Sequence, residues 1–206
     1  MLIGLFDSGV GGLSVMAACK KVLPACDFLY LDDSANAPYG DRSDGEIEAF
    51  SRRNLNLLFS AGCDAAVMAC NTATSVCADK MRAAFPDKTI LGLEPAVKPA
   101  LAENEGRVLL LATPVTAKHR FYPPRVTVKP EKTLAAEVEK AYGDPEKLRM
   151  LAERVYGECR AEGEFSVIVT GCSHYAHLAP YFPCKVYDGA EGVARRLLSL
   201  IGSSRK

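Results

Sequence analysis

The chain has 206 residues, a length that corresponds to one or two domains. Hydrophobic residues make up 49% and charged residues 24%, a composition that excludes collagen-like, low-complexity and disordered chains. The 25 basic residues balance the 25 acidic ones and no basic run is present, so we expect no nucleic-acid partner.

Apolar stretches such as residues 108–111 are far too short to cross a bilayer, so no membrane partner is expected. The chain opens on an apolar strand with no basic leader, which argues against a secretory signal. Its eight cysteines include no C-x-x-C pair, and a disulfide framework would imply a small secreted domain. We therefore expect a cytoplasmic protein in which each cysteine is, by default, a small buried hydrophobe.

Short apolar runs alternate with amphipathic stretches along the chain, a pattern that predicts an α/β fold with mainly parallel sheets. Strands are predicted at Leu2–Phe6, Phe28–Leu31, Ala65–Ala69, Thr89–Leu93, Arg107–Ala112, Arg125–Val128, Ser166–Thr170 and Lys185–Tyr187. Helices are predicted at 12–23, 44–61, 72–85, 95–103, 132–141, 145–162 and 190–201. Ser43 with Glu46 forms a capping box, and Asp144 before Pro145 is a second helix start.

The predicted strands fall into two sets of four that resemble each other. In each set the third strand runs into a cysteine, Cys70 or Cys172, and the first strand ends in a polar turn. The sequence therefore predicts two similar α/β domains, 1–98 and 99–206, with the C-terminal helix free to pack back on the first. Because ligands bind beyond the carboxyl ends of strands in open α/β sheets, we expect the two cysteines to face each other across a cleft.

Cys70 is the strongest single candidate for chemistry. Asn71 and Thr72 open a helix directly after it, and a helix N-terminus lowers the pKa of a thiol. Cys172 repeats the arrangement with His174 two residues on, and a histidine beside a cysteine can hold a thiolate or relay its proton. The alternative is that the cysteines belong to the core and His174 is a structural histidine.

The glycine-rich segment 7–12 (DSGVGG) follows the first strand and partly resembles a dinucleotide-binding fingerprint. The match is incomplete because Ser14 stands where the pattern requires Gly or Ala, and Asp7 would repel a pyrophosphate. The preferred interpretation is a tight turn capped by Asp7 and Ser8.

Two further segments offer polar groups to the cleft. Residues 37–40 (APYG) form a predicted turn whose functional alternative is a ligand-contacting loop. Thr113 and Thr116 offer hydroxyl groups or a helix cap after the fifth strand. The sequence contains no G-x-S-x-G, P-loop or H-E-x-x-H motif, and we expect neither a cofactor nor a metal.

Two opposed cysteines suit one kind of chemistry particularly well. An enzyme that inverts a carbon next to a carboxylate needs a base on one face and an acid on the other. A thiolate and a thiol supply both, and they exchange roles when the opposite enantiomer reacts. Hydroxyls, amides and helix N-termini at the strand ends would hold the substrate carboxylates.

These residues resemble the glutamate racemase family, cofactor-independent members of the aspartate/glutamate racemase superfamily. The matching segments are 4–14, 38–40, 69–73, 92–96, 111–113 and 171–175. The resemblance implies that Cys70 and Cys172 are the acid/base pair, assisted by Asp7 and His174. It implies contacts with the substrate glutamate from Asp7, Ser8, Pro38, Tyr39, Gly40, Asn71, Thr72, Thr113, Ser173 and His174. It also implies that Cys70 works on D-glutamate and Cys172 on L-glutamate, that the product D-glutamate supplies peptidoglycan, and that a homodimer is possible.

The chain departs from the family pattern between Thr113 and Gly171, where it is shorter than family members usually are. Family members have a further acidic residue near the second cysteine, in a stretch whose sequence is different in this chain. Glu137 and Glu139 are the two candidates for that role here, and the sequence does not distinguish between them. Ser173 replaces the usual threonine and keeps the hydroxyl, and residues 176–177 (AH) replace an apolar pair that contains proline.

Two alternatives to glutamate racemisation remain. One is a racemase or isomerase for aspartate or a related acid, and the cysteine motifs do not distinguish such an enzyme from a glutamate racemase. The other is a non-catalytic amino-acid-binding or regulatory relative. Retention of both cysteines together with His174 argues against the second alternative, because binding alone needs no matched thiols.

Overall fold

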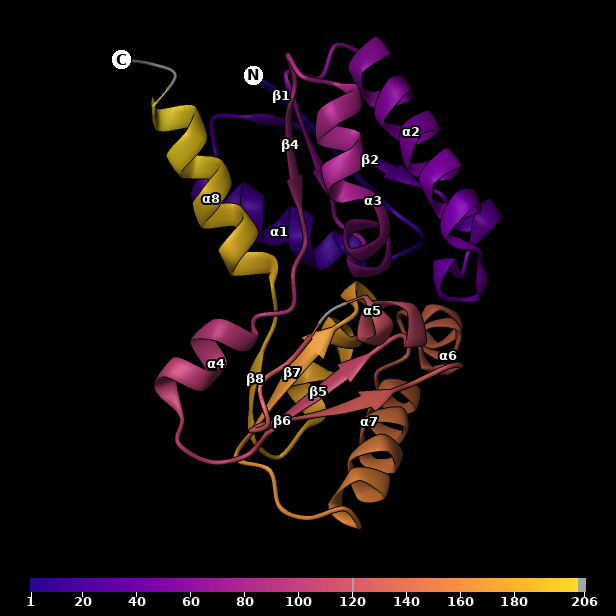
Figure 1. The fold of residues 1–206 in the computed structure, drawn as a ribbon, viewed down its shortest axis with the longest axis vertical. Coiled ribbons are helices and arrows are strands. Elements are labelled where there is room, and N and C mark those ends of the chain that lie inside the picture. The colour runs from indigo at the N-terminus through magenta and orange to yellow at the C-terminus, as the bar shows by residue number, and fades with distance from the viewer. Residues whose placement is uncertain (120, 204–206) are drawn as a thin grey trace.

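A computed structural model describes residues 1–119 and 121–203, and this part of the chain folds into two α/β halves, each built on a parallel sheet (Figure 1). Sheet A contains β1 (Leu2–Asp7), β2 (Asp27–Asp32), β3 (Ala65–Met68) and β4 (Thr89–Gly92), in the order β2-β1-β3-β4. Sheet B contains β5 (Val108–Ala112), β6 (Val126–Pro130), β7 (Val167–Gly171) and β8 (Lys185–Tyr187), in the order β6-β5-β7-β8. The two sheets therefore repeat one topology.

The predicted α/β class and all eight predicted strands are confirmed, with ends that shift by no more than two residues. The central strands β3, β5 and β7 are buried along their whole length, and β1 is buried from Ile3 onward, because helices cover both faces of a parallel sheet. Register then sets the geometry at the strand ends. Phe6 pairs with Met68 in sheet A, and Ala112 pairs with Gly171 in sheet B. The same register, continued past the strand ends, places Ser8 beside Cys70 and Thr113 beside Cys172.

Helices cover both faces of each sheet, and every helix predicted from the sequence is present. Sheet A lies between α2 (Asp44–Ser60) with α3 (Asn71–Ala84) on one face and α1 (Gly12–Val22) with α8 (Ala190–Ser203) on the other. Sheet B lies between α6 (Leu134–Ala141) with α7 (Pro145–Arg160) and α4 (Val97–Glu103). The capping box that starts α2 is confirmed, since Ser43 and Glu46 each bond the other's backbone N–H.

The sequence did not predict α5 (Pro114–Lys118) or the 3-10 helices η1 (Ser34–Asn36), η2 (Tyr39–Asp41) and η3 (Ser173–Tyr181). These elements are too short, or too tightly wound, to produce the 3.6-residue hydrophobic period on which the helix predictions depend. The cap of α5 was nevertheless recognisable, because the Thr113 hydroxyl accepts a hydrogen bond from the Thr116 N–H at 3.2 Å.

The chain crosses between the halves twice, once from β4 into α4 and once from β8 into α8. The second crossing returns α8 to the first half, where it packs against α1 (Figure 1). Val193, Leu197 and Ile201 of α8 join Ile3 and Val15 in one buried cluster. The domain limits 1–98 and 99–206 stay a prediction.

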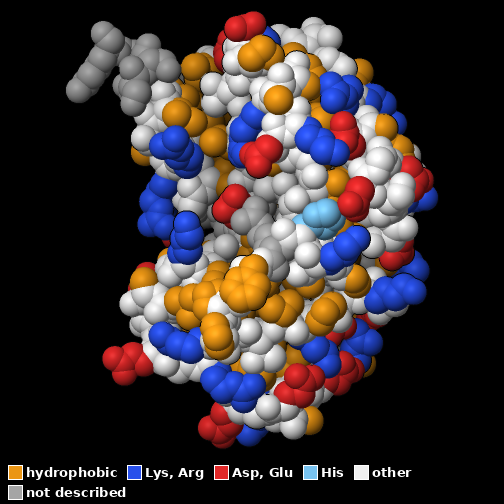
Figure 2. All heavy atoms as spheres, viewed as in Figure 1, with side chains coloured by type: hydrophobic (Ala, Val, Ile, Leu, Met, Phe, Trp, Pro, Cys, Tyr) orange, Lys and Arg blue, Asp and Glu red, His pale blue; other side chains and the backbone are white. Residues whose placement is uncertain are grey.

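The surface of the described residues mixes charge and apolar groups. Figure 2 shows acidic and basic side chains interspersed over one face, with hydrophobic side chains gathered over the half that contains sheet B. Phe121 is 95% exposed, the largest exposed fraction among the big hydrophobic side chains described. Within residues 1–119 and 121–203, none of the helices has the length and apolar character needed to span a bilayer.

The loop after β2 is organised by the buried carboxylate of Asp33. Tyr39 donates its hydroxyl proton to this carboxylate at 2.5 Å, and the Asn54 amide donates at 3.1 Å. Arg53 completes the group with an ion pair of 2.6 Å. Burial raises the pKa of Asp33, but the hydrogen bonds from Tyr39 and Asn54 outweigh it, and the net pKa is lowered.

We expect Asp33→Asn to lower the free energy of unfolding by about 1–3 kcal/mol at neutral pH, because an amide cannot accept all of these bonds. A carboxyl whose folded-state pKa is lowered stabilises the protein above its unfolded pKa of about 3.9 and loses that contribution as pH falls further. Urea unfolding at pH 7 and pH 3 should therefore show a difference between the proteins that shrinks in acid. Asp41→Asn, in the same loop but exposed, should change stability by no more than about 0.5 kcal/mol.

Candidate active site

A cavity of about 200 Å³ lies between the halves, at the carboxyl ends of the central strands. In sheet A it meets the ends of β1 and β3, and in sheet B those of β5 and β7. In each pair the two strands are neighbours, but the chain leaves them toward opposite edges of the sheet. Such a switch point is where open parallel sheets bind ligands. Its walls are formed by Ser8, Ala37, Pro38, Tyr39, Gly40, Cys70, Thr72, Thr113, Ala135, Ala136, Glu139, Lys140, Cys172 and His174.

Nine of the twelve residues predicted for the site line this cavity. They are Ser8, Pro38, Tyr39, Gly40, Cys70, Thr72, Thr113, Cys172 and His174. The other three, Asp7, Asn71 and Ser173, lie behind the wall and bond to other parts of the protein. Asn71 donates to the Leu93 carbonyl at 3.1 Å, and Ser173 donates to Asp7. A direct contact of these three residues with a substrate stays a prediction.

Cys70 lies at the end of β3 as the N-cap of α3 and is only 4% exposed. Its sulfur is 3.8 Å from the Ser8 hydroxyl oxygen. Burial, followed by the negative charge of Asp7, raises the pKa of the Cys70 thiol well above its ordinary value. This corrects the expectation that the helix start would lower that pKa. The Ala73 N–H does act in the lowering direction, but burial outweighs it. Cys70 is therefore held as a thiol.

Asp7 forms the base of the glycine turn that follows β1. Its carboxylate accepts the Gly12 N–H at 2.8 Å and the Ser173 hydroxyl at 3.2 Å, so it ties η3 of the second half to this turn. Burial raises the pKa of Asp7, and the charge of His174 and these hydrogen bonds only partly oppose the rise. The predicted capping of the turn by Asp7 is confirmed.

The outer face of the same turn is occupied by the second half of the protein. A Cβ added at Gly11 would lie 2.5 Å from the backbone nitrogen of His174, and one at Gly9 would lie 2.2 Å from a carboxylate oxygen of Glu139. Only glycine permits so close an approach. The space that a pyrophosphate would need in the dinucleotide-binding alternative is filled by protein.

Cys172 lies at the end of β7 and belongs to a chain of three polar side chains. Its sulfur is 3.9 Å from His174 Nδ1, and His174 Nε2 is 2.6 Å from Glu139 Oε2. Burial lowers the pKa of His174, but its bonds to Cys172 and Glu139 prevail and raise that pKa well above the ordinary value. His174 is therefore a protonated imidazolium, able to hand a proton to the sulfur beside it or to take one back.

The structure separates the two glutamates between which the sequence did not choose. Glu139 faces the cavity, bonds His174 and accepts the Val10 N–H at 3.0 Å. Burial raises the pKa of Glu139, but these hydrogen bonds outweigh burial and lower it. Glu137 instead pairs with Arg154 at 2.6 Å on the outer side of α6. Glu139 is thus the acidic residue of the site.

Hydroxyl groups from the two halves also meet at the wall of the cavity. Thr72, at the start of α3, lies 3.0 Å from Thr113 at the end of β5, oxygen to oxygen. Thr113 also donates to Thr116 at 3.1 Å. Hydroxyls in this position can turn to donate to a carboxylate, while the Thr113 oxygen still caps α5.

Helix α6 supplies wall residues that the sequence did not single out, namely Ala135, Ala136 and Lys140. They lie in the stretch that does not resemble the known family, so no motif marks them. The spacing of Leu134 and Val138 predicts the helix and its buried face, but it does not predict which flank meets the cavity. Lys140 is the one lysine or arginine among the wall residues.

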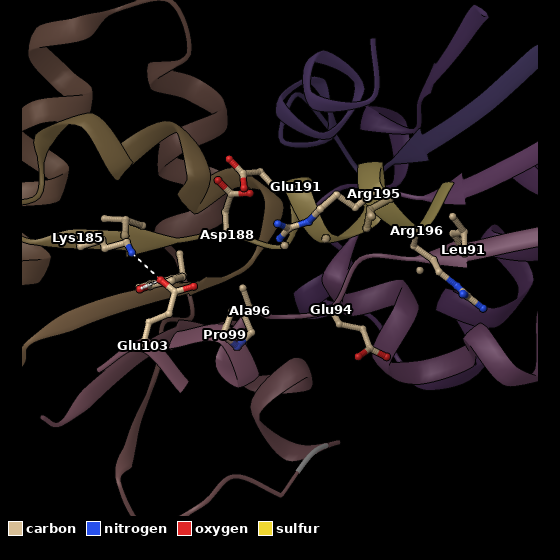
Figure 3. A pocket seen from close by; sticks show the side chains of 16 residues that line it. Leu91, Glu94, Ala96, Pro99, Glu103, Lys185, Asp188, Glu191, Arg195 and Arg196 are labelled. Carbon is tan, nitrogen blue, oxygen red and sulfur yellow. Dashed lines mark hydrogen bonds and ion pairs between the residues drawn. The ribbon is translucent and has the colours of Figure 1, made fainter. Parts of the chain in front are cut away.

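A second cavity, of about 450 Å³, lies at the two crossings between the halves (Figure 3). Charged side chains surround it, among them Glu94, Arg195 and Arg196, and Lys185 pairs with Glu103 at 2.8 Å. No cysteine or histidine lines this larger cavity. The smaller cavity, which brings both thiols and the imidazolium together, is therefore the candidate active site.

The fold and the site together define an α/β protein of two like halves, with a thiol from each half facing one cavity. A family model described as Asp/Glu/Hydantoin racemase matches residues 3–197. The chain belongs to this family, and it is an amino-acid racemase.

Named relatives agree with this assignment. The chain is 38% identical over 186 residues to a glutamate racemase of Clostridium novyi, a match that covers 85% of this chain and 71% of the relative. It is 35% identical over 211 residues to a glutamate racemase of Pseudomonas paraeruginosa, covering 95% and 79%. Its structure is similar to that of Escherichia coli glutamate racemase in complex with L-glutamate and the activator UDP-MurNAc-ala. That comparison gives a TM-score of 0.84 at 29% identity and covers 98% of this chain and 82% of the other.

Proposed function

We propose that this protein interconverts L-glutamate and D-glutamate without a cofactor, with Cys70 and Cys172 as the two acid/base groups. The observation that carries the proposal is that one small cavity has a thiol from each half on its wall. Relatives named glutamate racemase, 35–38% identical over most of the chain, support glutamate as the substrate.

The two thiols have different surroundings, and this difference suggests the resting state. Cys70 is kept as a thiol by burial and by Asp7, whereas Cys172 has the His174 imidazolium beside it. An imidazolium next to a sulfur is the arrangement that activates cysteine in many enzymes. Cys172 is therefore the base at rest and Cys70 the acid. Asp7 acts on Cys70 through its charge.

The reaction then balances as follows. The Cys172 thiolate takes the Cα proton of one enantiomer, and the carbanion receives the proton of the Cys70 thiol on its other face. The products are the opposite enantiomer, a Cys172 thiol and a Cys70 thiolate, which together are the starting state for the reverse direction. The family resemblance assigns Cys172 to L-glutamate and Cys70 to D-glutamate.

The size of the cavity supports a small amino acid as the substrate. The cavity volume of about 200 Å³ is below the range of roughly 300–1,000 Å³ typical of drug-sized ligand pockets. Thr72 and Thr113 offer hydroxyl donors to one carboxylate, and Ser8 lies beside Cys70. Pro38, Tyr39 and Gly40 form the loop wall against which the substrate chain would lie.

Three finer points belong to the same proposal. D-Glutamate made here would supply peptidoglycan synthesis, as the family resemblance implies. The reaction would take place in the cytoplasm, which the composition favours. A homodimer stays a prediction.

The test is circular dichroism of L-glutamate and, separately, of D-glutamate incubated with the purified protein, with no cofactor added. Both solutions should lose optical activity. In D₂O, the first product formed should carry deuterium at Cα while the unreacted substrate keeps its protium, because the removed and added protons belong to different thiols. Early exchange into the substrate pool would indicate a single base and contradict the mechanism.

The same assay separates the alternatives. Loss of optical activity from aspartate but not glutamate would keep the two-thiol chemistry and change the substrate. Binding of glutamate in calorimetry with no turnover of either acid would indicate the non-catalytic relative.

A further inference from the structure

His177 does not line the cavity, but it bonds to the glycine turn (residues 7–12), whose Ser8 does. Its Nε2 is 3.2 Å from the carbonyl oxygen of Val10, which belongs to the glycine turn of the other half. A carbonyl oxygen only accepts hydrogen bonds, so Nε2 carries the proton and His177 is the donor. The contact therefore joins η3 to the turn after β1 by a directional bond.

Val10 is held at both of its backbone polar groups. Its N–H donates to Glu139 Oε2 at 3.0 Å, while its carbonyl accepts from His177 and, at 3.1 Å, from the Leu13 N–H of its own half. The same Glu139 oxygen lies 2.6 Å from His174 Nε2. One residue of the first half thus connects His177 to the Glu139–His174 pair of the second half.

The backbone of the rest of the glycine turn is held by bonds within the first half: Tyr30 donates to the Gly9 carbonyl and the Gly12 N–H donates to Asp7. Val10 is the residue of the turn that is bonded to the second half at both its N–H and its carbonyl. Gly9 and Gly11 also lie so close to Glu139 and His174 that no side chain would fit between them. A small movement of Val10 is therefore transmitted directly to the Glu139 carboxylate.

We propose that His177 is a positioning residue for the racemisation reaction: by fixing the Val10 carbonyl, it keeps the Val10 N–H on Glu139 and thereby aims His174 at Cys172. This inference deepens the proposed function and rests on it for the role of Cys172. His177 touches neither the cavity nor the sulfur, so it acts only through the turn.

The surroundings of His177 suit this role. Its ring lies edge-on to Tyr142, with the ring centres 5.0 Å apart, so its orientation is fixed. Burial, opposed by the bond to Val10 and aided by the charge of His174, lowers the pKa of His177. The imidazole is therefore neutral at physiological pH and adds no second positive charge beside His174.

The experiment compares His177→Leu, which removes the donor, with His177→Gln, whose amide can donate over a similar reach. For each protein we would measure kcat for glutamate and the rates of iodoacetamide alkylation at Cys172 and Cys70, resolved by peptide mass spectrometry. His177→Leu should lower kcat and the Cys172 alkylation rate by about tenfold, a loss typical of removing a supporting hydrogen bond. The Cys70 rate should not change, and His177→Gln should recover most of both losses.

His119→Leu is the matched control. His119 is another of the three histidines, and it also forms a contact between the halves, with Asp44 at 3.2 Å, but it touches neither Val10 nor Glu139. This variant should leave the ratio of the two alkylation rates unchanged. The melting temperature of every variant would be recorded to detect general loss of structure.

Two outcomes overturn the inference. One is a His177→Leu protein whose Cys172 alkylation rate equals that of the wild type. The other is equal impairment of the Leu and Gln variants, which would mean that His177 contributes packing alone. The alkylation readout needs no turnover, so it decides the role of His177 even if the wild type proves inactive on glutamate and the proposed function fails.

Discussion

Replacing Cys70 or Cys172 with serine is expected to lower glutamate racemisation by about 10²–10⁴-fold, the contribution usual for a positioned acid or base. A serine hydroxyl is too weak an acid to exchange a proton with Cα near neutral pH, although it occupies almost the same space. The two enantiomers have equal free energy, so kcat/KM must be identical in both directions for every variant. Each substitution should therefore reduce both directions equally, as measured by circular dichroism from each enantiomer.

Cys77→Ser is the control for this pair. Cys77 is buried in α3 and donates to the Ala73 carbonyl at 3.3 Å, a bond that serine can keep. Its variant should retain activity. If Cys70→Ser or Cys172→Ser also retained near wild-type activity, the two-thiol mechanism would be wrong.

Glu139→Gln is expected to lower kcat by about 10²–10⁴-fold, on the scale seen when the carboxylate that orients a catalytic histidine is replaced by an amide. The amide carries no charge to support the His174 imidazolium, so the pKa of His174 falls, although Cys172 and Asp7 continue to raise it. His174 then loses its proton at lower pH than in the wild type. In the pH profile of kcat/KM, the limb that reports His174 should shift toward lower pH.

Glu137→Gln tests whether this effect belongs to the site. Glu137 lies on the same helix, two residues away, but pairs with Arg154 on the outer side. Removing an exposed pair of this kind costs no more than about 1 kcal/mol of stability. The variant should keep its kcat and its pH profile. An equal loss in both variants would point to damage to α6 instead of a specific role for Glu139.

The sheets were predictable because their signals are local. Runs such as 108–111 and 167–169 are apolar throughout, which is sufficient to place a strand buried on both faces. The likeness of the two halves was also predictable, from the repeat of a cysteine after each third strand. The 3-10 helix that begins at Ser173 was not predictable, because its shape depends on the glycine turn of the other half against which it packs.

The candidate site was predictable where motifs end strands and was not predictable where helix α6 meets the cavity. Cys70, Cys172 and His174 are fixed by the sheets, so their sequence positions already indicated that they would meet. Glu137 and Glu139 are two residues apart on one helix, and which of them faces inward depends on how α6 rolls against η3. Lys140 has the same dependence, and no local pattern identified it.

The return of α8 to the first half has a consequence for biosynthesis. The cluster beneath β1 and α1 is completed by Val193, Leu197 and Ile201, which are translated after every other element of the fold. The elements of sheet B, in contrast, form one unbroken stretch of chain, from β5 to β8. On the ribosome, the half that is synthesised first therefore has all of its strands early but lacks part of its core until α8 is made, whereas the second half has all of its strands as soon as β8 is made.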